Sequence, residues 1–281
     1  MSWNYNIFCF FGCENLCVAA YGLQNDSAGE NMKQNTAETE QEKKKGLLRL
    51  FELLDRDLAK FFKAGVLAFA GLIPLMACTA AAVVSGSPLL LAGNTICGMI
   101  AAPQFCAAAD TVMRSIRDEV GWWWWESYRA AWKRDLRASL LPGAIFGLLY
   151  SVEIYLLYSV ARLENPAGEF WLLFASVLIS LAVTGSFLPM LVCMELPFGA
   201  LIKNCFFLFF SSPLRCIAAA VLRLLYAGVI LLWFPLTLVL FFLGSVWLPM
   251  LLSALILWPA LDAHFSLSAA YQKLRDEKWQ A

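Results

Sequence analysis

The sequence is poor in the residues from which catalytic and metal sites are built. It has a single histidine, His264, among 281 residues, and one histidine alone makes neither a metal site nor a catalytic triad. It has no glycine-rich phosphate loop and no Cys-x2-Cys pair of the kind that holds zinc. We therefore expect a protein that is not an enzyme, with no catalytic residue, no metal site and no cofactor.

Charge is scarce as well. Charged residues make up only 15% of the chain, and 21 basic side chains balance 21 acidic ones. A net charge of zero gives no reason to expect nucleic acid or an acidic substrate as a partner. Hydrophobic residues, in contrast, make up 60% of the chain. Ordinary globular domains are about 45–50% apolar and about 25% charged, so this composition indicates a multi-pass membrane protein.

The first 45 residues do not have the pattern of a membrane span. The N-terminus has no basic n-region and polar residues interrupt its apolar stretch, so we expect no cleavable signal peptide. Residues 24–45 are polar and are expected to form a disordered tether. Cys9, Cys13 and Cys17 recur every four residues, on one face of a helix. A metal or redox site there is one interpretation, and small apolar packing residues are the one we favour.

Six apolar segments are long enough to cross a bilayer, whose hydrocarbon core of about 30 Å requires roughly 20 helical residues. The expected spans cover residues 61–84, 88–109, 138–160, 170–192, 215–238 and 244–263. The second span contains the tripeptide GNT and a proline, which could break it. The sequence therefore predicts an all-α membrane domain over residues 46–275 with about six transmembrane helices, followed by a short tail, 276–281.

Basic residues are confined to alternate loops of this topology. They precede the first span, lie between spans two and three and between spans four and five, and recur in the tail. The opposite loops contain one basic residue, Arg162. Because cytoplasmic loops carry the excess of lysine and arginine, we predict that both termini lie in the cytoplasm.

Amphipathic helices are expected at the inner surface of the bilayer. Residues 47–61 place leucine and phenylalanine at three- and four-residue spacing opposite charged residues, which predicts an interfacial helix that runs into the first span. Residues 119–140 predict a second interfacial helix, an elbow that begins in four consecutive tryptophans. Residues 195–215 repeat the order of span, elbow and span, and a tandem duplication is one interpretation of that repeat.

Tryptophan favours the headgroup level of a bilayer, and basic side chains there meet anionic lipid. The elbow is therefore predicted to anchor the chain to an anionic inner leaflet. The anchor consists of Trp122, Trp123, Trp124, Trp125, Trp132, Arg129, Lys133, Arg134 and Arg137. A cation–π cage for a ligand is the alternative, but it needs converging acidic residues that this run does not show.

Two charged residues fall inside predicted spans and are the candidate intramembrane site. At 1.5 Å per residue, Glu153 lies roughly 20 Å and Arg223 roughly 12 Å from the inner edge. Charged residues at such depths are functional candidates by default. One interpretation is a polar site or proton relay. The other is a structural ion pair, or an arginine that reaches back to the interface.

The stretches "APQFCAAADTVMRSIRDE" and "ESYRAAWKRDLRASLLPG" carry a proline followed by alanine, two arginines, and then an aromatic and basic elbow. The residues concerned are Pro103, Ala107, Arg114, Arg117, Tyr128, Ala131, Trp132 and Lys133. In this pattern, over about residues 46–275, the chain resembles the YesL-type family of bacterial integral membrane proteins. Asp135 departs from the asparagine common in that family, and the cysteine-bearing extension 1–45 is unusual for it.

The resemblance implies a bacterial cytoplasmic membrane protein without a settled biochemical activity and without catalytic residues to carry over. Family members often lie near carbohydrate-uptake genes, so the resemblance implies an accessory or regulatory component of solute uptake, with transporter subunits as partners. Two other functions stay open. An autonomous small-solute transporter would use Glu153 and Arg223, and a structural or lipid-organising protein would need only the tryptophan and basic belt.

Overall fold

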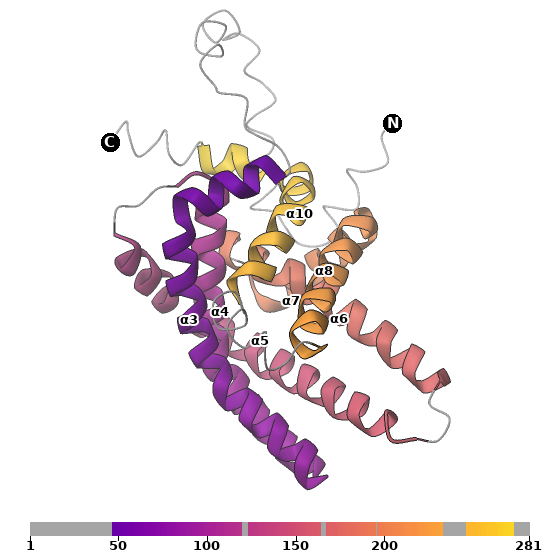
Figure 1. Cartoon of the computed structure of the whole chain (residues 1–281). Coiled ribbons are helices and arrows are strands. Elements are labelled where there is room, and N and C mark those ends of the chain that lie inside the picture. The colour runs from indigo at the N-terminus through magenta and orange to yellow at the C-terminus, as the bar shows by residue number, and fades with distance from the viewer. Residues whose placement is uncertain (1–46, 120–122, 164–166, 195, 233–245, 273–281) are drawn as a thin grey trace, which may run out of the picture. The chain divides into compact units, whose positions relative to one another are not determined.

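The computed structural model describes residues 47–119, 123–163, 167–194, 196–232 and 246–272 (Figure 1). The chain divides into two units, residues 1–45 and 46–281. The predicted tether and Cys9, Cys13 and Cys17 lie outside the described residues, as does Trp122.

The regular elements of the second unit are helices in all of its described ranges. In chain order they are α3 (Leu47–Ser85), η2 (Pro88–Ala92), α4 (Gly93–Ile116), α5 (Trp124–Val160), α6 (Ala167–Cys193), α7 (Phe198–Ser211), α8 (Pro213–Leu232) and α10 (Trp247–Phe265). A further helical stretch occupies residues 267–272.

Five of these segments are long and apolar enough to cross a membrane: α3, η2 with α4, α5, α6 and α10. The pair of α7 and α8 meets the same test only jointly, and it is bent by 104° at the break between the two helices. Five or six spans result, and the prediction of an all-α membrane protein is confirmed. The last part of the predicted fifth span, 233–238, lies outside the described residues.

Large apolar side chains cover the outside of these helices. Six residues on five of the helices are each at least 42% exposed: Ile73, Ile100, Ile145, Ile154, Ile179 and Val229. A soluble monomer rarely exposes so much apolar surface, whereas in a bilayer the lipid tails cover it. The exposed apolar side chains and the length of the apolar helices therefore both indicate a membrane protein.

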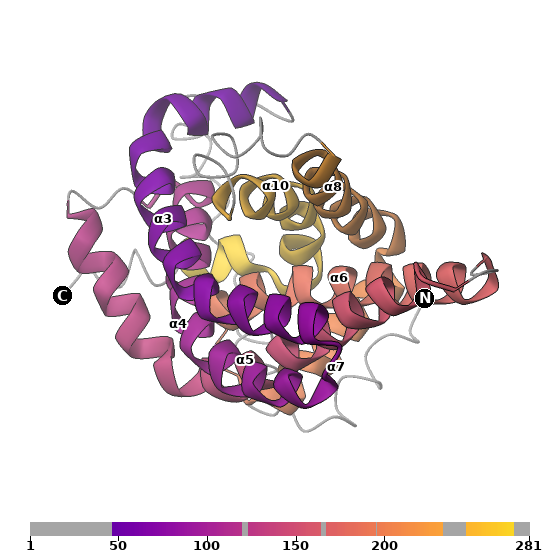
Figure 2. The same ribbon diagram turned by 60° about the horizontal axis from the view of Figure 1, so that its bottom comes forward.

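The first two predicted interfacial segments, 47–61 and 119–140, are not separate helices in the structure. α3 runs without interruption from Leu47 to Ser85 and α5 from Trp124 to Val160. The lead segment of α3, residues 47–60, nevertheless points away from the rest of that helix (Figure 2). Pro74 and Pro142 lie inside the two helices, where a proline kinks a helix without having to end it. Because α3 and α5 are continuous, each predicted interfacial segment is joined directly to a span.

The possible break in the second predicted span is located at its start. Gly93, Asn94 and Thr95 form the first turn of α4, directly after the short helix η2. α4 then continues through Pro103 to Ile116. The tripeptide therefore separates a short turn from a long helix and does not interrupt the span in its middle.

α4 and α5 cross at glycines. A Cβ atom on Gly98 would overlap the carbonyl oxygen of Gly143, and one on Gly147 would lie 2.8 Å from the Cα of Gly98. Small residues let helix backbones approach closely in membranes, where packing and not the hydrophobic effect drives helix association. This crossing holds the start of α5 beside the end of α4, which is where the candidate site lies.

Candidate functional site

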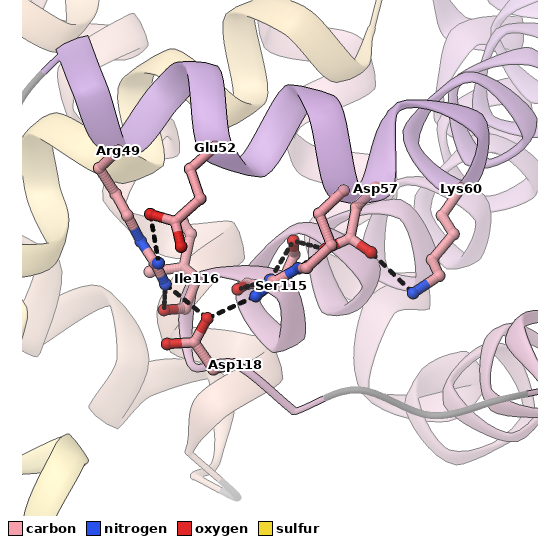
Figure 3. A network of polar contacts seen from close by, with 8 residues as sticks. Arg49, Glu52, Asp57, Lys60, Ser115, Ile116 and Asp118 are labelled. Atoms are coloured by element: carbon pink, nitrogen blue, oxygen red, sulfur yellow. Dashed lines mark hydrogen bonds and ion pairs between the residues drawn. The ribbon is translucent and has the colours of Figure 1, made fainter. Parts of the chain in front are cut away.

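The end of α4 is closed by a left-handed turn. Asp118 has a φ of 62°, its N–H donates to Ser115 (3.1 Å), and the N–H of Glu119 donates to Arg114 (2.9 Å). This pair of bonds is a Schellman motif, in which glycine usually occupies the left-handed position. Aspartate is one of the few other residues that tolerate it. The turn directs the carboxylate of Asp118 toward the lead segment of α3 (Figure 3).

Asp118 is bound by two arginines of that lead segment. Its Oδ1 accepts from Arg49 (2.6 Å) and from Arg56 (2.7 Å). The same arginines donate to the carbonyl oxygens of Ile116 (3.3 Å) and Ser115 (2.8 Å). The last carbonyl oxygens of a helix lack hydrogen-bond donors within that helix. The lead segment of α3 therefore supplies donors to the end of α4.

Asp57 is the second centre of this network, and it is only 3% exposed. It accepts hydrogen bonds from Lys60 (2.7 Å), from Arg56 (2.8 Å) and, in a short bond, from the hydroxyl of Ser115. Burial alone would raise the pKa of Asp57, but these three hydrogen bonds outweigh it and hold that pKa below its ordinary value. The pKa of Asp118 is lowered in the same way, its two arginines outweighing the effect of burial.

A further set of ion pairs ties α4 to the start of α5. Asp110, which is 2% exposed, binds Arg114 (2.5 Å) and Arg134 (3.3 Å). Arg134 also binds Asp135 (2.7 Å). Arg134, one of the predicted anchor residues, binds these two carboxylates while its side chain stays 41% exposed. Arg129, Lys133 and Arg137 are exposed, as an anchor requires.

The tryptophan run is divided between surface and interior. Trp123 and Trp125 are 73% and 55% exposed. Trp124 packs on Tyr128, with ring centroids 5.3 Å apart, and the ammonium of Lys63 lies 5.8 Å from the centre of its ring. Trp132 is partly buried against the core. Trp123 and Trp125 are therefore exposed, whereas Trp124 and Trp132 pack against the core.

A small cavity lies at this end of the helices, between α3, α4 and the start of α5. Its volume is about 40 Å³. It is lined by Asp57, Lys60, Phe61, Asp110, Thr111, Arg114, Ser115, Glu119, Trp124 and Ser127. A water requires roughly 10–15 Å³ by this kind of measure, whereas pockets for drug-sized ligands have about 300 Å³ or more. By this measure the cavity has room for about three or four waters.

Glu153, the first predicted intramembrane residue, is 4% exposed on α5. Its Oε1 accepts a hydrogen bond from Ser180 of α6 (2.6 Å), and Ser176 of the same helix lies beside the carboxyl group. Its Oε2 is buried without a hydrogen-bond partner. The side chain is therefore half satisfied by hydroxyls and leaves one acceptor open.

Arg223, the second, joins α8 to α10 and α6. Its Nη2 donates to Ser253 (2.6 Å) and to the carbonyl oxygen of Gly185 (3.4 Å), and its Nε donates to Ser253 (3.1 Å). A Cβ atom on Gly185 would lie 2.7 Å from Nη1 of Arg223. Glycine at this position is therefore what lets the guanidinium group approach the backbone of α6.

The two charges do not pair directly in the described part of the chain, where no ion pair includes either of them. Tyr150 of α5 lies between them, within electrostatic range of both Glu153 and Arg223, and its hydroxyl bonds to Thr184 in a short contact. Thr184 in turn donates to the carbonyl oxygen of Ser180 (2.7 Å). Hydrogen bonds therefore link Glu153 to α6 through Ser180, and Tyr150 to the same helix through Thr184, whereas Arg223 bonds to Ser253 and Gly185.

A comparison with known protein families, with curated proteins and with solved structures gives no match for this chain. The geometry above and the sequence resemblance are therefore the basis for its function.

Proposed function

We propose that the chain is an accessory or regulatory component of a solute-uptake system in the bacterial cytoplasmic membrane, with carbohydrate as the class of solute. The ion pairs and hydrogen bonds among Arg49, Arg56, Asp57, Lys60, Ser115 and Asp118 form what we call the Arg49–Asp118 network. In this proposal, the end of the helices that carries this network faces the cytoplasm, together with both termini. Its resemblance to the YesL-type family supports the role, and the distribution of lysine and arginine supports the orientation. Transporter subunits and an anionic inner leaflet are the proposed partners.

One observation carries the choice of an accessory over a carrier: the polar groups of the described helices serve to hold helices together. Arg223 binds Ser253 and Gly185, Glu153 binds Ser180, and Asp57 binds side chains of α3 and α4. The cavity beside Asp57, about 40 Å³, holds a few waters, and neither Glu153 nor Arg223 lines it. This arrangement suits a protein that presents a fixed surface to a partner.

A second candidate is an autonomous small-solute transporter, and one specific feature favours it. Glu153 has a buried oxygen without a hydrogen-bond partner, and Tyr150, one turn earlier on α5, lies within electrostatic range of both Glu153 and Arg223. Transporters bind coupling ions and protons at such intramembrane groups. The third candidate, a lipid-organising protein, rests on the exposed Trp123 and Trp125.

Co-purification from the native membrane tests the proposed partner. The chain is tagged at its own locus, extracted in a mild detergent, and its companions are quantified by mass spectrometry. We expect a transporter subunit in about one-to-one ratio, and we expect it to be absent when an unrelated membrane protein carries the tag. A chain that purifies as a single species from freshly solubilised membranes would contradict the proposal.

A further inference from the structure

Two thiol groups face each other across α3 and α4. The Sγ atoms of Cys78 and Cys97 are 3.6 Å apart, and both cysteines are free. At 1.5 Å per residue, Cys78 lies about 10 Å before the end of α3 and Cys97 about 6 Å after the start of α4. The pair therefore lies near η2, at the opposite end of these helices from the Arg49–Asp118 network.

The surroundings keep the two thiols in register. In the next layer, Asn94 of α4 donates to Thr79 of α3 (3.0 Å), and Thr79 contacts the hydroxyl of Ser151 on α5 (3.2 Å). All three of these side chains are at most 5% exposed. α4 is fixed in turn by its glycine crossing with α5, where a Cβ on Gly147 would lie 2.8 Å from the carbonyl oxygen of Asn94. The helices therefore have little freedom to move the thiols apart.

The geometry points to a modification site: we propose that Cys78 and Cys97 form a reversible disulfide that fastens α3 to α4. The two sulfurs need to approach by about 1.5 Å to reach the bond length of roughly 2.05 Å. Cys78 is half-buried while Cys97 is buried, so Cys78 is the thiol that an oxidant reaches first.

The co-reactant is a small disulfide. The thiolate of Cys78 attacks one of its sulfurs, a mixed disulfide forms and the first small thiol leaves. The thiolate of Cys97 then attacks the sulfur of Cys78, and the second small thiol leaves. In total two protein thiols are oxidised to one disulfide, one small disulfide is reduced to two thiols, and the two protons end on the released thiols.

The proposed orientation places this pair on the non-cytoplasmic side, where disulfides persist. The contact between the thiols does not depend on that orientation, nor on a role in uptake. Closing the link removes conformational freedom from the unfolded hairpin of α3 and α4, so the oxidised chain is expected to unfold at a higher temperature than the reduced chain.

Native membranes that contain the chain are treated with 4,4′-dithiodipyridine, a membrane-permeant small disulfide, and the protein is digested without reduction for mass spectrometry. We expect the peptides of Cys78 and Cys97 to be joined, at two hydrogens below their summed mass. In Cys97→Ser we expect a stable pyridyl disulfide on Cys78. Cys106→Ser, which replaces another cysteine of α4, is expected to leave the link unchanged.

A stable pyridyl disulfide on Cys78 in the wild-type chain would overturn the proposal, as would a link from Cys78 to any other cysteine. The unfolding temperature gives a second, independent readout. The linked chain is expected to unfold several degrees above the reduced chain, and dithiothreitol is expected to reverse the shift. An unfolding temperature that is unaffected by the link would show that it fastens nothing.

Discussion

Replacing Gly98 with alanine is expected to prevent the chain from accumulating in folded form. The added methyl group would overlap the carbonyl oxygen of Gly143. Because that atom belongs to the backbone of α5, no side-chain rotation can relieve the clash, and the two helices must separate. Overpacking usually costs about 1–3 kcal/mol, and a contact between backbones that carries the α4–α5 crossing should reach or exceed the upper value.

Gly228→Ala is the matched control for this substitution, because a Cβ atom on this helical glycine of α8 meets no atom within 4 Å. Size-exclusion chromatography of fluorescently tagged variants, extracted in a mild detergent, measures the folded fraction. We expect the monodisperse peak of Gly98→Ala to fall at least tenfold, with Gly228→Ala close to wild type. Equal peaks for the two variants would mean that α4 and α5 do not cross as described.

Asp57→Ala is expected to be the most damaging change in the Arg49–Asp118 network. It removes a carboxylate that is 3% exposed and leaves Lys60 and the hydroxyl of Ser115 without their partner. Hydrogen bonds to charged groups contribute about 1.5–3 kcal/mol each to stability, less when neighbours can rearrange. We expect a net loss of about 3 kcal/mol, or an unfolding temperature lower by roughly 6–10 °C.

Glu52→Ala is the control, because Glu52 is on the same segment but its side chain is 37% exposed, and among the described residues its ion pair is to Arg49 (3.1 Å). Exposed pairs contribute roughly 0–1 kcal/mol, so this variant should unfold within about 2 °C of wild type. The two substitutions differ mainly in burial. Equal effects would show that Asp57 is solvated and that the network does not join α3 to α4.

The same carboxylate makes stability depend on pH. The pKa of Asp57 is lower in the folded chain than its ordinary value, which is about 3.9 in an unfolded chain. Its contribution is therefore fully present above about pH 4 and is lost as pH falls through the folded pKa. The stability difference between wild type and Asp57→Ala should accordingly shrink on acidification below pH 4, and should be constant between pH 5 and 7.

The spans were predictable because the bilayer sets their length and the residues report it directly. An elbow was also expected after the fourth span, at residues 195–215, and residues 198–211 form a helix of their own there, α7. The bend of 104° before α8 falls at Ser212 and Pro213, where proline disfavours a helical conformation in the residue before it. The sequence indicated an elbow there but not its angle, since tertiary packing sets the angle.

The network at the basic end of the helices was not predictable from local pattern. Arg49 and Asp118 are 69 residues apart, and nothing in either segment specifies the other. The bond of Arg134 to Asp110 was equally invisible, since Asp110 is on another helix. Single-chain periodicity finds which face of a helix is polar, but not whether lipid, water or another helix meets it.

A signal for the glycine crossing does stand in the sequence. Gly143 and Gly147 are spaced four residues apart in "GAIFG", the spacing at which small residues let membrane helices pack closely. Gly185 had no such pattern, and its role appears only through the approach of Arg223. Glu153 and Arg223 stand out in the sequence as charges within apolar segments, whereas their bonds to Ser180, Ser253 and Gly185 depend on how the helices pack.

In the role proposed above, the chain assists uptake without carrying solute at Glu153. The most direct test is the initial rate of uptake of a panel of labelled carbohydrates, in the native host lacking the chain and complemented with wild type, Glu153→Gln or Glu153→Ala at equal membrane levels. We predict that deletion lowers uptake of at least one carbohydrate severalfold and that Glu153→Gln, which keeps an acceptor for Ser180, restores it to within twofold of wild type. The contrary result is that wild type restores uptake while Glu153→Gln leaves it at the level of the deletion. That result would contradict the accessory role and identify the chain as a carrier.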